Sequence, residues 1–160
     1  MVDITEISAV VAAAGVLVGV IYYILDMRNQ TKIRQTDLIL RLQSDWRSKE
    51  LRESYRTVMR MKFIDYDEYA KKEMDSPEVQ AAFDICSFFD GIGILLHRKL
   101  VDIDMVDEIF SFYVKVAWEK VKPLIEGRRR ESEFDPEFRK WFEYLYNEVK
   151  KRERGGVKSD

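Results

Sequence analysis

The first part of the chain holds one long apolar segment. Residues 7–25 read ISAVVAAAGVLVGVIYYIL, nineteen residues without a charge. A helix of that length rises about 28 Å, which is close to the hydrocarbon thickness of a bilayer. Tyr22 and Tyr23 lie at its end, where aromatic side chains meet the membrane interface. The segment therefore predicts a transmembrane helix.

Two other interpretations compete with a membrane anchor. A cleaved signal peptide has a basic start, a shorter apolar core and small residues at its cleavage site. Here the start is acidic, and bulky Tyr22, Tyr23 and Ile24 end the segment. A core helix of a soluble protein carries a polar stripe, which this segment lacks. We therefore favour the anchor.

The charges on the two sides of this segment predict its orientation. Acidic Asp3 and Glu6 precede it, and basic Arg28, Lys32 and Arg34 follow it. Because cytoplasmic flanks carry the basic excess, we expect a single pass through the cell membrane, with the N-terminus outside and the remaining chain in the cytoplasm. The three basic residues are then candidate contacts for the anionic headgroups of membrane lipid.

Four small residues of the segment form a candidate helix-association face. Ser8, Ala12, Gly15 and Gly19 follow one another at spacings of four, three and four, and so share one side of a helix. Gly15 and Gly19 form a GxxxG pair, which allows two backbones to approach closely. This face predicts a homo-oligomer, although alanine and glycine also occur in membrane helices that do not associate.

The rest of the chain has helical periodicity. Apolar residues recur every three or four positions in residues 38–59, 79–96, 106–121 and 138–149. Ser76 before Pro77 is typical of a helix start, and either Asp102 or Asp104 is expected to cap the next helix. The segment from Pro77 to about His97 is apolar around most of its circumference, which predicts a place in the middle of a bundle.

The predicted fold class is all-α. The transmembrane helix continues into a cytoplasmic bundle of about four to five helices, since no glycine or proline interrupts residues 20–76. We expect three parts: a transmembrane anchor at residues 1–27, a helical bundle at 28–150 and a flexible charged tail at 151–160. Gly127 is expected to end one helix, and Asp135 with Pro136 to open the last.

The amino-acid composition excludes several classes of partner and of metal site. Lysine and arginine number 27 and aspartate and glutamate 29, which excludes a polycation that coats nucleic acid and makes nucleic acid an unexpected partner. Residues 28–62 nevertheless hold ten basic and four acidic residues. The single cysteine, Cys86, and the single histidine, His97, exclude an internal disulfide and a zinc site of cysteine and histidine ligands.

The sequence holds no recognisable catalytic motif. Cys86 lies in an apolar helical stretch, where burial makes a thiol inert, and His97 lies at a helix end. The carboxylates after Asp102 do not fit a calcium loop, because Val106 and Asp107 stand where an oxygen ligand and a glycine are needed. We therefore expect no catalytic residue, no cofactor and no metal, and the protein is not expected to be an enzyme.

Two sets of charged residues are candidates for special contacts. Asp84 and Asp90 interrupt the most apolar helix on roughly opposite sides, which predicts buried ion pairs with an arginine such as Arg52 or Arg56. The run Arg128, Arg129 and Arg130 is a candidate anion contact. The simpler interpretation of that run is a solvated helix end, where the helix dipole favours cations.

Three stretches resemble a known family. They are residues 51–56 (LRESYR), residues 88–96 (FFDGIGILL) leading into 100–102 (LVD), and residues 118–125 (WEKVKPLI). Over roughly residues 36–149 the chain resembles a widespread prokaryotic family of short membrane-anchored helical proteins described as a domain of unknown function. That resemblance implies an all-helical cytoplasmic domain behind one membrane helix and assigns no activity. A looser likeness to small CRISPR-associated membrane proteins implies a pore.

These observations predict a single-pass helical scaffold or adaptor that self-associates and recruits a cytoplasmic or membrane partner. The alternative is a homo-oligomeric pore or a channel-like accessory protein, although the apolar segment offers water little beyond Ser8. A third class is an enzyme at the membrane surface that uses Asp84 and Asp90.

Overall fold

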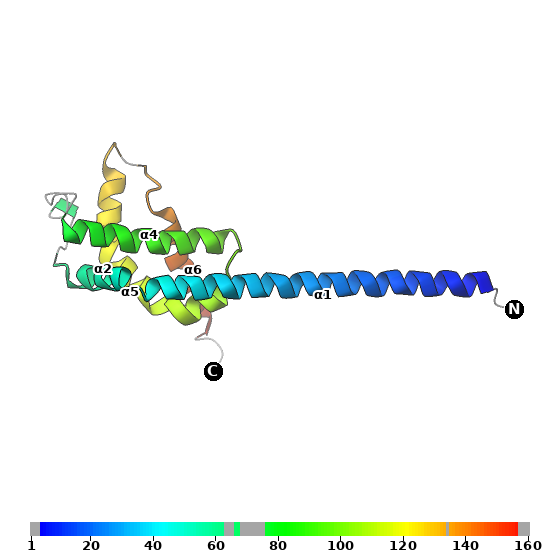
Figure 1. The fold of residues 1–160 in the computed structure, drawn as a ribbon. Helices are drawn as coiled ribbons and strands as arrows, with labels where there is room; N and C mark the ends of the chain where they lie inside the picture. The colour runs from blue at the N-terminus through cyan, green and yellow to red at the C-terminus, as the bar shows by residue number, and fades with distance from the viewer. Residues whose placement is uncertain (1–3, 63–65, 68–75, 134, 157–160) are drawn as a thin grey trace. The chain divides into compact units, whose positions relative to one another are not determined.

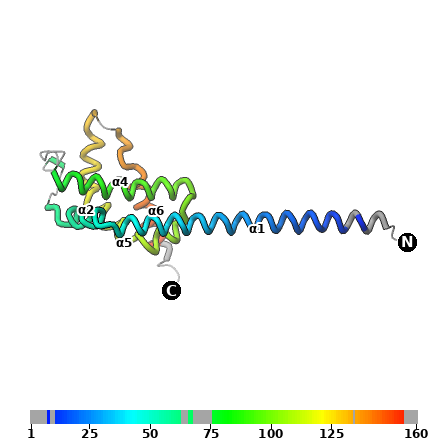
Figure 2. Tube along the Cα trace, in the orientation of Figure 1, coloured from blue at the N-terminus to red at the C-terminus, as the bar shows by residue number. Residues whose placement is uncertain are grey.

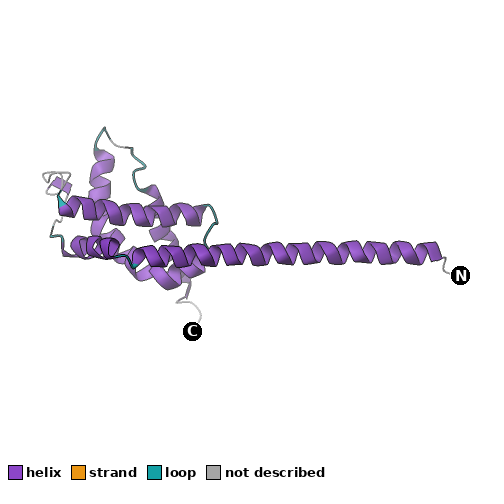
Figure 3. Cartoon of the chain, in the orientation of Figure 1, coloured by secondary structure: helices purple, strands orange, loops and turns teal. Residues whose placement is uncertain are grey.

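The computed structural model describes residues 4–62, 66–67, 76–133 and 135–156. Figure 1 labels five helices: α1 (Ile4–Trp46), α2 (Lys49–Arg60), α4 (Pro77–His97), α5 (Ile103–Arg130) and α6 (Lys140–Gly156). Within the described residues there is no strand, and turns and loops join the helices (Figure 3). The all-α prediction is therefore confirmed.

The chain divides into two units, Met1–Asp37 and Leu38–Asp160. The first unit holds the N-terminal part of α1, which Figure 2 traces as one helix that also continues into the second unit. The second unit holds the last residues of α1 together with the other helices. It is the helical bundle.

Helix α4 is the central helix of the bundle. It packs against α2, α5 and α6. Ile85, Phe89 and Ile92 along it have no exposed surface. A helix this apolar is stable in water only when its neighbours cover most of its circumference, as they do here.

An aromatic cluster joins the helices of the bundle. The ring of Trp46, at the end of α1, lies 5.4 Å from Phe89 of α4 and 6.4 Å from Phe110 of α5, measured between centroids. Phe89 in turn stacks on Phe142 of α6 at 5.1 Å. Removing one such ring from a core costs about 3–5 kcal/mol, so this cluster is a main source of the bundle's stability.

A break after Trp46 separates α1 from α2, inside the segment for which the sequence predicted no interruption. The side-chain oxygen of Ser48 accepts a hydrogen bond from the backbone N–H of Leu51 at 3.2 Å. Ser48 is therefore the N-cap of α2. The signal for this break is a single serine in a charged stretch.

Gly127 does not end α5, which was the expectation, because the helix continues through Pro123 and Gly127 to Arg130. A Cβ atom at Gly127 would lie 2.1 Å from the ring of Tyr66. This glycine thus permits a close approach of that ring instead of capping the helix.

Helix α6 begins at Lys140, later than the expected start at Asp135 and Pro136. Arg139 has a φ of 59°, in the left-handed region, and a right-handed helix cannot run through such a residue. The helix then continues to Gly156, which lies within the segment expected to be a tail. Residues 157–160 lie outside the described residues.

Candidate functional site

The apolar segment of α1 leaves its side chains uncovered. Leu17 is 63% exposed and Tyr22 is 72% exposed. From Val11 onward the helix has the length and hydropathy of a membrane span, which are also those of a signal sequence. Helix α4 meets the same criteria, but half of its apolar stretch is buried inside the bundle, as befits a core helix.

The residues predicted to associate and to contact lipid are exposed on α1. Ser8 and Ala12 are exposed, and a Cβ atom at Gly15 or Gly19 would meet no described atom within 4 Å. The basic residues after the apolar segment are also exposed. Arg28, Lys32 and Arg34 form no ion pair with a described residue. Both features are therefore accessible to a second helix or to lipid.

The two aspartates of α4 differ in their surroundings. Asp84 is exposed and accepts a hydrogen bond from Ser54 Oγ at 2.9 Å, so it does not form the expected buried ion pair. Asp90 Oδ2 lies 3.9 Å from Arg139 Nη1, and the two side chains are 18% and 11% exposed. Its other oxygen accepts the backbone N–H of Phe142 at 3.0 Å. Asp90 thus pairs across the α4–α6 contact, and its partner is neither Arg52 nor Arg56.

Arg139 is held on several sides at this contact. Its guanidinium carbon lies 4.8 Å from the ring centre of Phe83 and 5.1 Å from that of Phe138. Its Nη2 donates to Ser87 Oγ at 2.9 Å. A left-handed backbone costs an ordinary residue about 1–2 kcal/mol, which these contacts offset. The pair of Asp90 and Arg139 therefore positions the start of α6 on α4.

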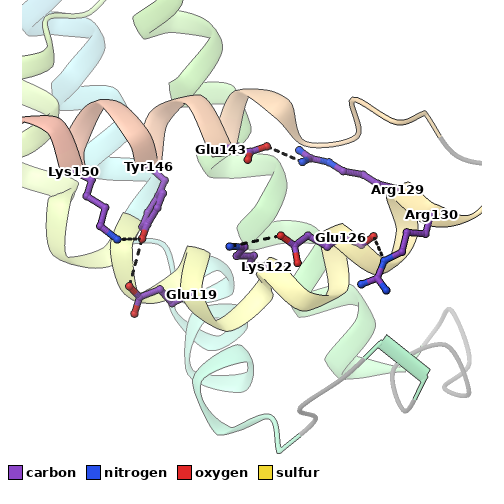
Figure 4. A network of polar contacts seen from close by, with 8 residues as sticks. All are labelled: Glu119, Lys122, Glu126, Arg129, Arg130, Glu143, Tyr146 and Lys150. Carbon is purple, nitrogen blue, oxygen red and sulfur yellow. Dashed lines mark hydrogen bonds and ion pairs between the residues drawn. The ribbon is translucent and has the colours of Figure 1, made fainter.

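The arginine run at the end of α5 makes contacts within the chain, and Figure 4 draws those of Arg129 with Glu143 and of Arg130 with Glu126. Arg129 Nη1 donates to Glu143 Oε2 at 2.7 Å, and Arg129 Nε donates to the carbonyl oxygen of Phe138 at 2.9 Å. Arg130 Nε donates to the carbonyl oxygen of Glu126 at 3.2 Å. Arg128 lies 5.9 Å from the ring centre of Phe138. Arg129 ties α5 to α6, so its charge is already matched by a carboxylate.

The residues with reactive side chains give no sign of catalysis. Burial raises the pKa of the Cys86 thiol to about 12, so the thiol is protonated at neutral pH. His97 is exposed at the end of α4, with its ring 4.4 Å from that of Trp141. In the part of the chain that the structure describes, no three His, Cys, Asp or Glu side chains are arranged to hold a metal ion.

A groove in the bundle gathers three arginines around aromatic side chains, and we call it the arginine groove. Its volume is about 580 Å³, and its walls come from the end of α1, from α2 and from α5. The lining residues are Gln43, Trp46, Arg47, Arg52, Tyr55, Arg56, Glu108, Ile109 and Tyr113.

Aromatic packing shapes the arginine groove. The ring of Trp46 lies 5.2 Å from that of Tyr55 and 4.9 Å from that of Tyr113, and the two tyrosine rings are 5.6 Å apart. Burial raises the pKa of the Tyr55 phenol, and the neighbouring Tyr113 raises it further. Tyr55 is therefore a neutral phenol with a proton to donate at physiological pH.

All three arginines of the groove are exposed. None of them forms an ion pair with a described residue. The sequence predicted Arg52 or Arg56 as a partner of the α4 aspartates, and no pattern in it links these two arginines with Arg47. Two features of the sequence point towards the arginine groove, the basic excess of residues 28–62 and the LRESYR stretch. Neither signal reveals Glu108 and Tyr113, because these approach the arginines only when α5 packs on α2.

Comparison with known proteins places the chain in a family. A family model described as a domain of unknown function (DUF4760) matches residues 9–149, from the apolar segment of α1 to α6. The match begins earlier than the resemblance noted from the sequence, which started near residue 36, and it shows neither membrane anchoring nor a likeness to CRISPR-associated proteins. No curated protein and no solved structure matches the chain. Because the family model covers most of its length, the chain belongs to the DUF4760 family.

Proposed function

We propose that this protein is a single-pass membrane protein whose helical bundle is a cytoplasmic scaffold or adaptor for a protein partner. The observation that carries the proposal is the exposed apolar segment of α1, which precedes a bundle with a core of its own. Exposing large apolar side chains such as Val16 and Leu17 to water costs about 25 cal/mol of free energy per Å² of apolar surface. Lipid removes that cost without requiring a protein partner for the segment.

The flanking charges support the orientation of this proposal. Arg28, Lys32 and Arg34 are exposed on α1 just after the apolar segment, where cytoplasmic headgroups attract basic side chains by about 1 kcal/mol each. The bundle then lies in the cytoplasm, where it is accessible to soluble partners and to the cytoplasmic parts of other membrane proteins.

A charge in the apolar segment is expected to weaken anchoring. Leu17→Arg raises the free energy of insertion by about 3 to 4 kcal/mol, because the favourable leucine is lost and the guanidinium must enter the hydrocarbon core. The measurement is the fraction of protein that stays with membranes after an alkaline carbonate wash, which should fall for Leu17→Arg. Leu40→Arg is the matched control: Leu40 is also on α1 and 57% exposed, but lies in the bundle unit.

Two results contradict the anchor. The first is complete release of the unmodified protein by the wash. The second is membrane or secreted protein whose intact mass lacks the N-terminal residues, which identifies the segment as a cleaved signal sequence.

Bulky residues on the small-residue face are expected to reduce self-association. In Gly15→Leu with Gly19→Leu, the new side chains stop two backbones from meeting, so the mass measured by light scattering in nanodiscs should fall to that of one copy. Val16→Leu with Val20→Leu has the same spacing on another side of the helix and should leave the mass unchanged. A strict monomer before substitution contradicts self-association, and a closed ring of several copies that conducts ions favours the pore.

A further inference from the structure

We infer that the arginine groove binds an organic phosphate, with the phosphate on Arg47, Arg52 and Arg56 and the organic part against Tyr55, Ile109 and Tyr113. This goes beyond the proposed scaffold role and does not depend on it. The ligand chemistry follows from the charge, the donors and the size of the groove.

The charge of the groove matches a phosphate group. Its lining holds three arginines against one carboxylate, Glu108, which leaves a net charge of +2. A phosphate monoester carries a charge between about −1.5 and −2 at neutral pH. A single carboxylate on a ligand offers half of that charge and two oxygens, enough for one arginine fork, whereas a phosphate offers oxygens to all three.

The arginines are placed so that they can act together. Arg52 and Arg56 are four residues apart on α2 and therefore share one face of that helix, and Arg47 lies in the turn that precedes it. Each guanidinium is a planar fork that binds phosphate oxygens in pairs. No described carboxylate lies within ion-pair distance of any of them, so a ligand does not have to displace an internal salt bridge.

The groove has room for more than inorganic phosphate, and its walls suit an organic group. A volume of about 580 Å³ falls in the range of about 300–1,000 Å³ that is typical of sites for organic ligands. Tyr55 and Tyr113 are half-buried and Ile109 lies beside them, which provides an apolar wall. Gln43 and the protonated Tyr55 hydroxyl are neutral hydrogen-bonding groups for the remaining polar atoms of the ligand. Two sources share this chemistry, a soluble nucleotide and the headgroup of an anionic phospholipid.

Calorimetric titration of the full chain in phosphatidylcholine nanodiscs tests the inference. The probes are inorganic pyrophosphate, adenosine diphosphate and a water-soluble short-chain phosphatidic acid, with short-chain phosphatidylcholine as the neutral comparison. Adenosine diphosphate binding more tightly than the other two identifies a nucleotide site. Phosphatidic acid binding more tightly identifies a headgroup site.

Substitution of the arginines shows whether the groove is the site. Arg47→Gln, Arg52→Gln and Arg56→Gln together should weaken binding of the preferred probe by at least about 30-fold, because charged hydrogen bonds are lost. The same three residues changed to lysine keep the charge but lose the forks, and should weaken it by about threefold to tenfold. The matched control replaces three exposed arginines outside the groove: Arg60→Gln, Arg98→Gln and Arg154→Gln. This control should change the affinity for the preferred probe by less than about twofold. Thermal unfolding followed by tryptophan fluorescence confirms that each variant is folded.

Three outcomes overturn the inference. One is the absence of binding for every phosphate probe at millimolar concentration. Another is equal weakening by the groove variant and by the control, which indicates diffuse attraction to surface charge. The last is tighter binding of a synthetic acidic peptide than of any phosphate, which assigns the groove to a protein partner.

Discussion

Gly93→Ala is expected to destabilise the bundle by about 3 to 4 kcal/mol, the largest effect we expect of any single methyl group in this protein. A Cβ atom at Gly93 would lie 2.0 Å from the carbonyl oxygen of Trp141 and 3.2 Å from its Cβ atom. The obstacle is backbone, which cannot move away as a flexible side chain can. Helices α4 and α6 must therefore separate around the new methyl group, and the aromatic stacking of Phe89 on Phe142 weakens with them.

Gly91→Ala is the matched control and should have the opposite sign. Gly91 lies two residues away in the same helix, and a Cβ atom there meets nothing within 4 Å among the described residues. Alanine favours a helix interior over glycine by about 1 kcal/mol, so the variant should be more stable by up to that amount. Urea unfolding followed by tryptophan fluorescence measures both variants, since Trp46, Trp118 and Trp141 all lie in the bundle unit. Equal changes for both variants contradict a close α4–α6 contact at Gly93.

Asp90→Ala is expected to destabilise the bundle by about 2 to 3 kcal/mol. The substitution leaves the largely buried guanidinium of Arg139 without its carboxylate, and the backbone N–H of Phe142 without its acceptor. Removing one member of a buried pair costs about 3–5 kcal/mol, and the partial exposure of Asp90 reduces that cost. Because Arg139 also has a strained backbone, the start of α6 should loosen first. Denaturant unfolding measures the free energy, and amide exchange at Phe142 measures the local opening.

Asp84→Ala tests whether position within α4 decides the effect. Asp84 is on the same helix but is exposed, and among the described residues it bonds only to the Ser54 hydroxyl, so its loss should change stability by about 0.5 kcal/mol or less. Asp90→Asn should fall between the two, because an amide oxygen still accepts the N–H of Phe142 while the charge is gone. Similar losses for Asp84→Ala and Asp90→Ala would falsify the ion-pair assignment.

Local signals in the sequence predicted the helices of this protein well. The start of α4 is an example: the side chain of Ser76 accepts the N–H of Val79 at 3.4 Å, and Pro77 follows at the first helical position, as expected. Asp102 caps α5 in the same way, with its side chain accepting the N–H of Asp104 at 2.7 Å. Helix caps of this kind can be predicted from the sequence because the donor and the acceptor of a cap lie within a few residues of each other. The start of α6 was missed because no local signal marks the left-handed backbone of Arg139, and the residues that contact its side chain, Phe83, Asp90 and Ser87, lie on another helix.

The sequence by itself determined the helical class, the apolar segment of α1 and the central place of α4, because each depends on hydrophobic periodicity along a continuous stretch. Only the tertiary structure decided which aspartate of α4 is paired, which of Gly91 and Gly93 is crowded and which arginines line one groove. Asp84 and Asp90 are chemically identical, and so are Gly91 and Gly93; they differ only in what another helix places beside them. The arginine groove depends in the same way on α5 packing beside α2, since long-range contacts of this kind leave no pattern in the residues that make them.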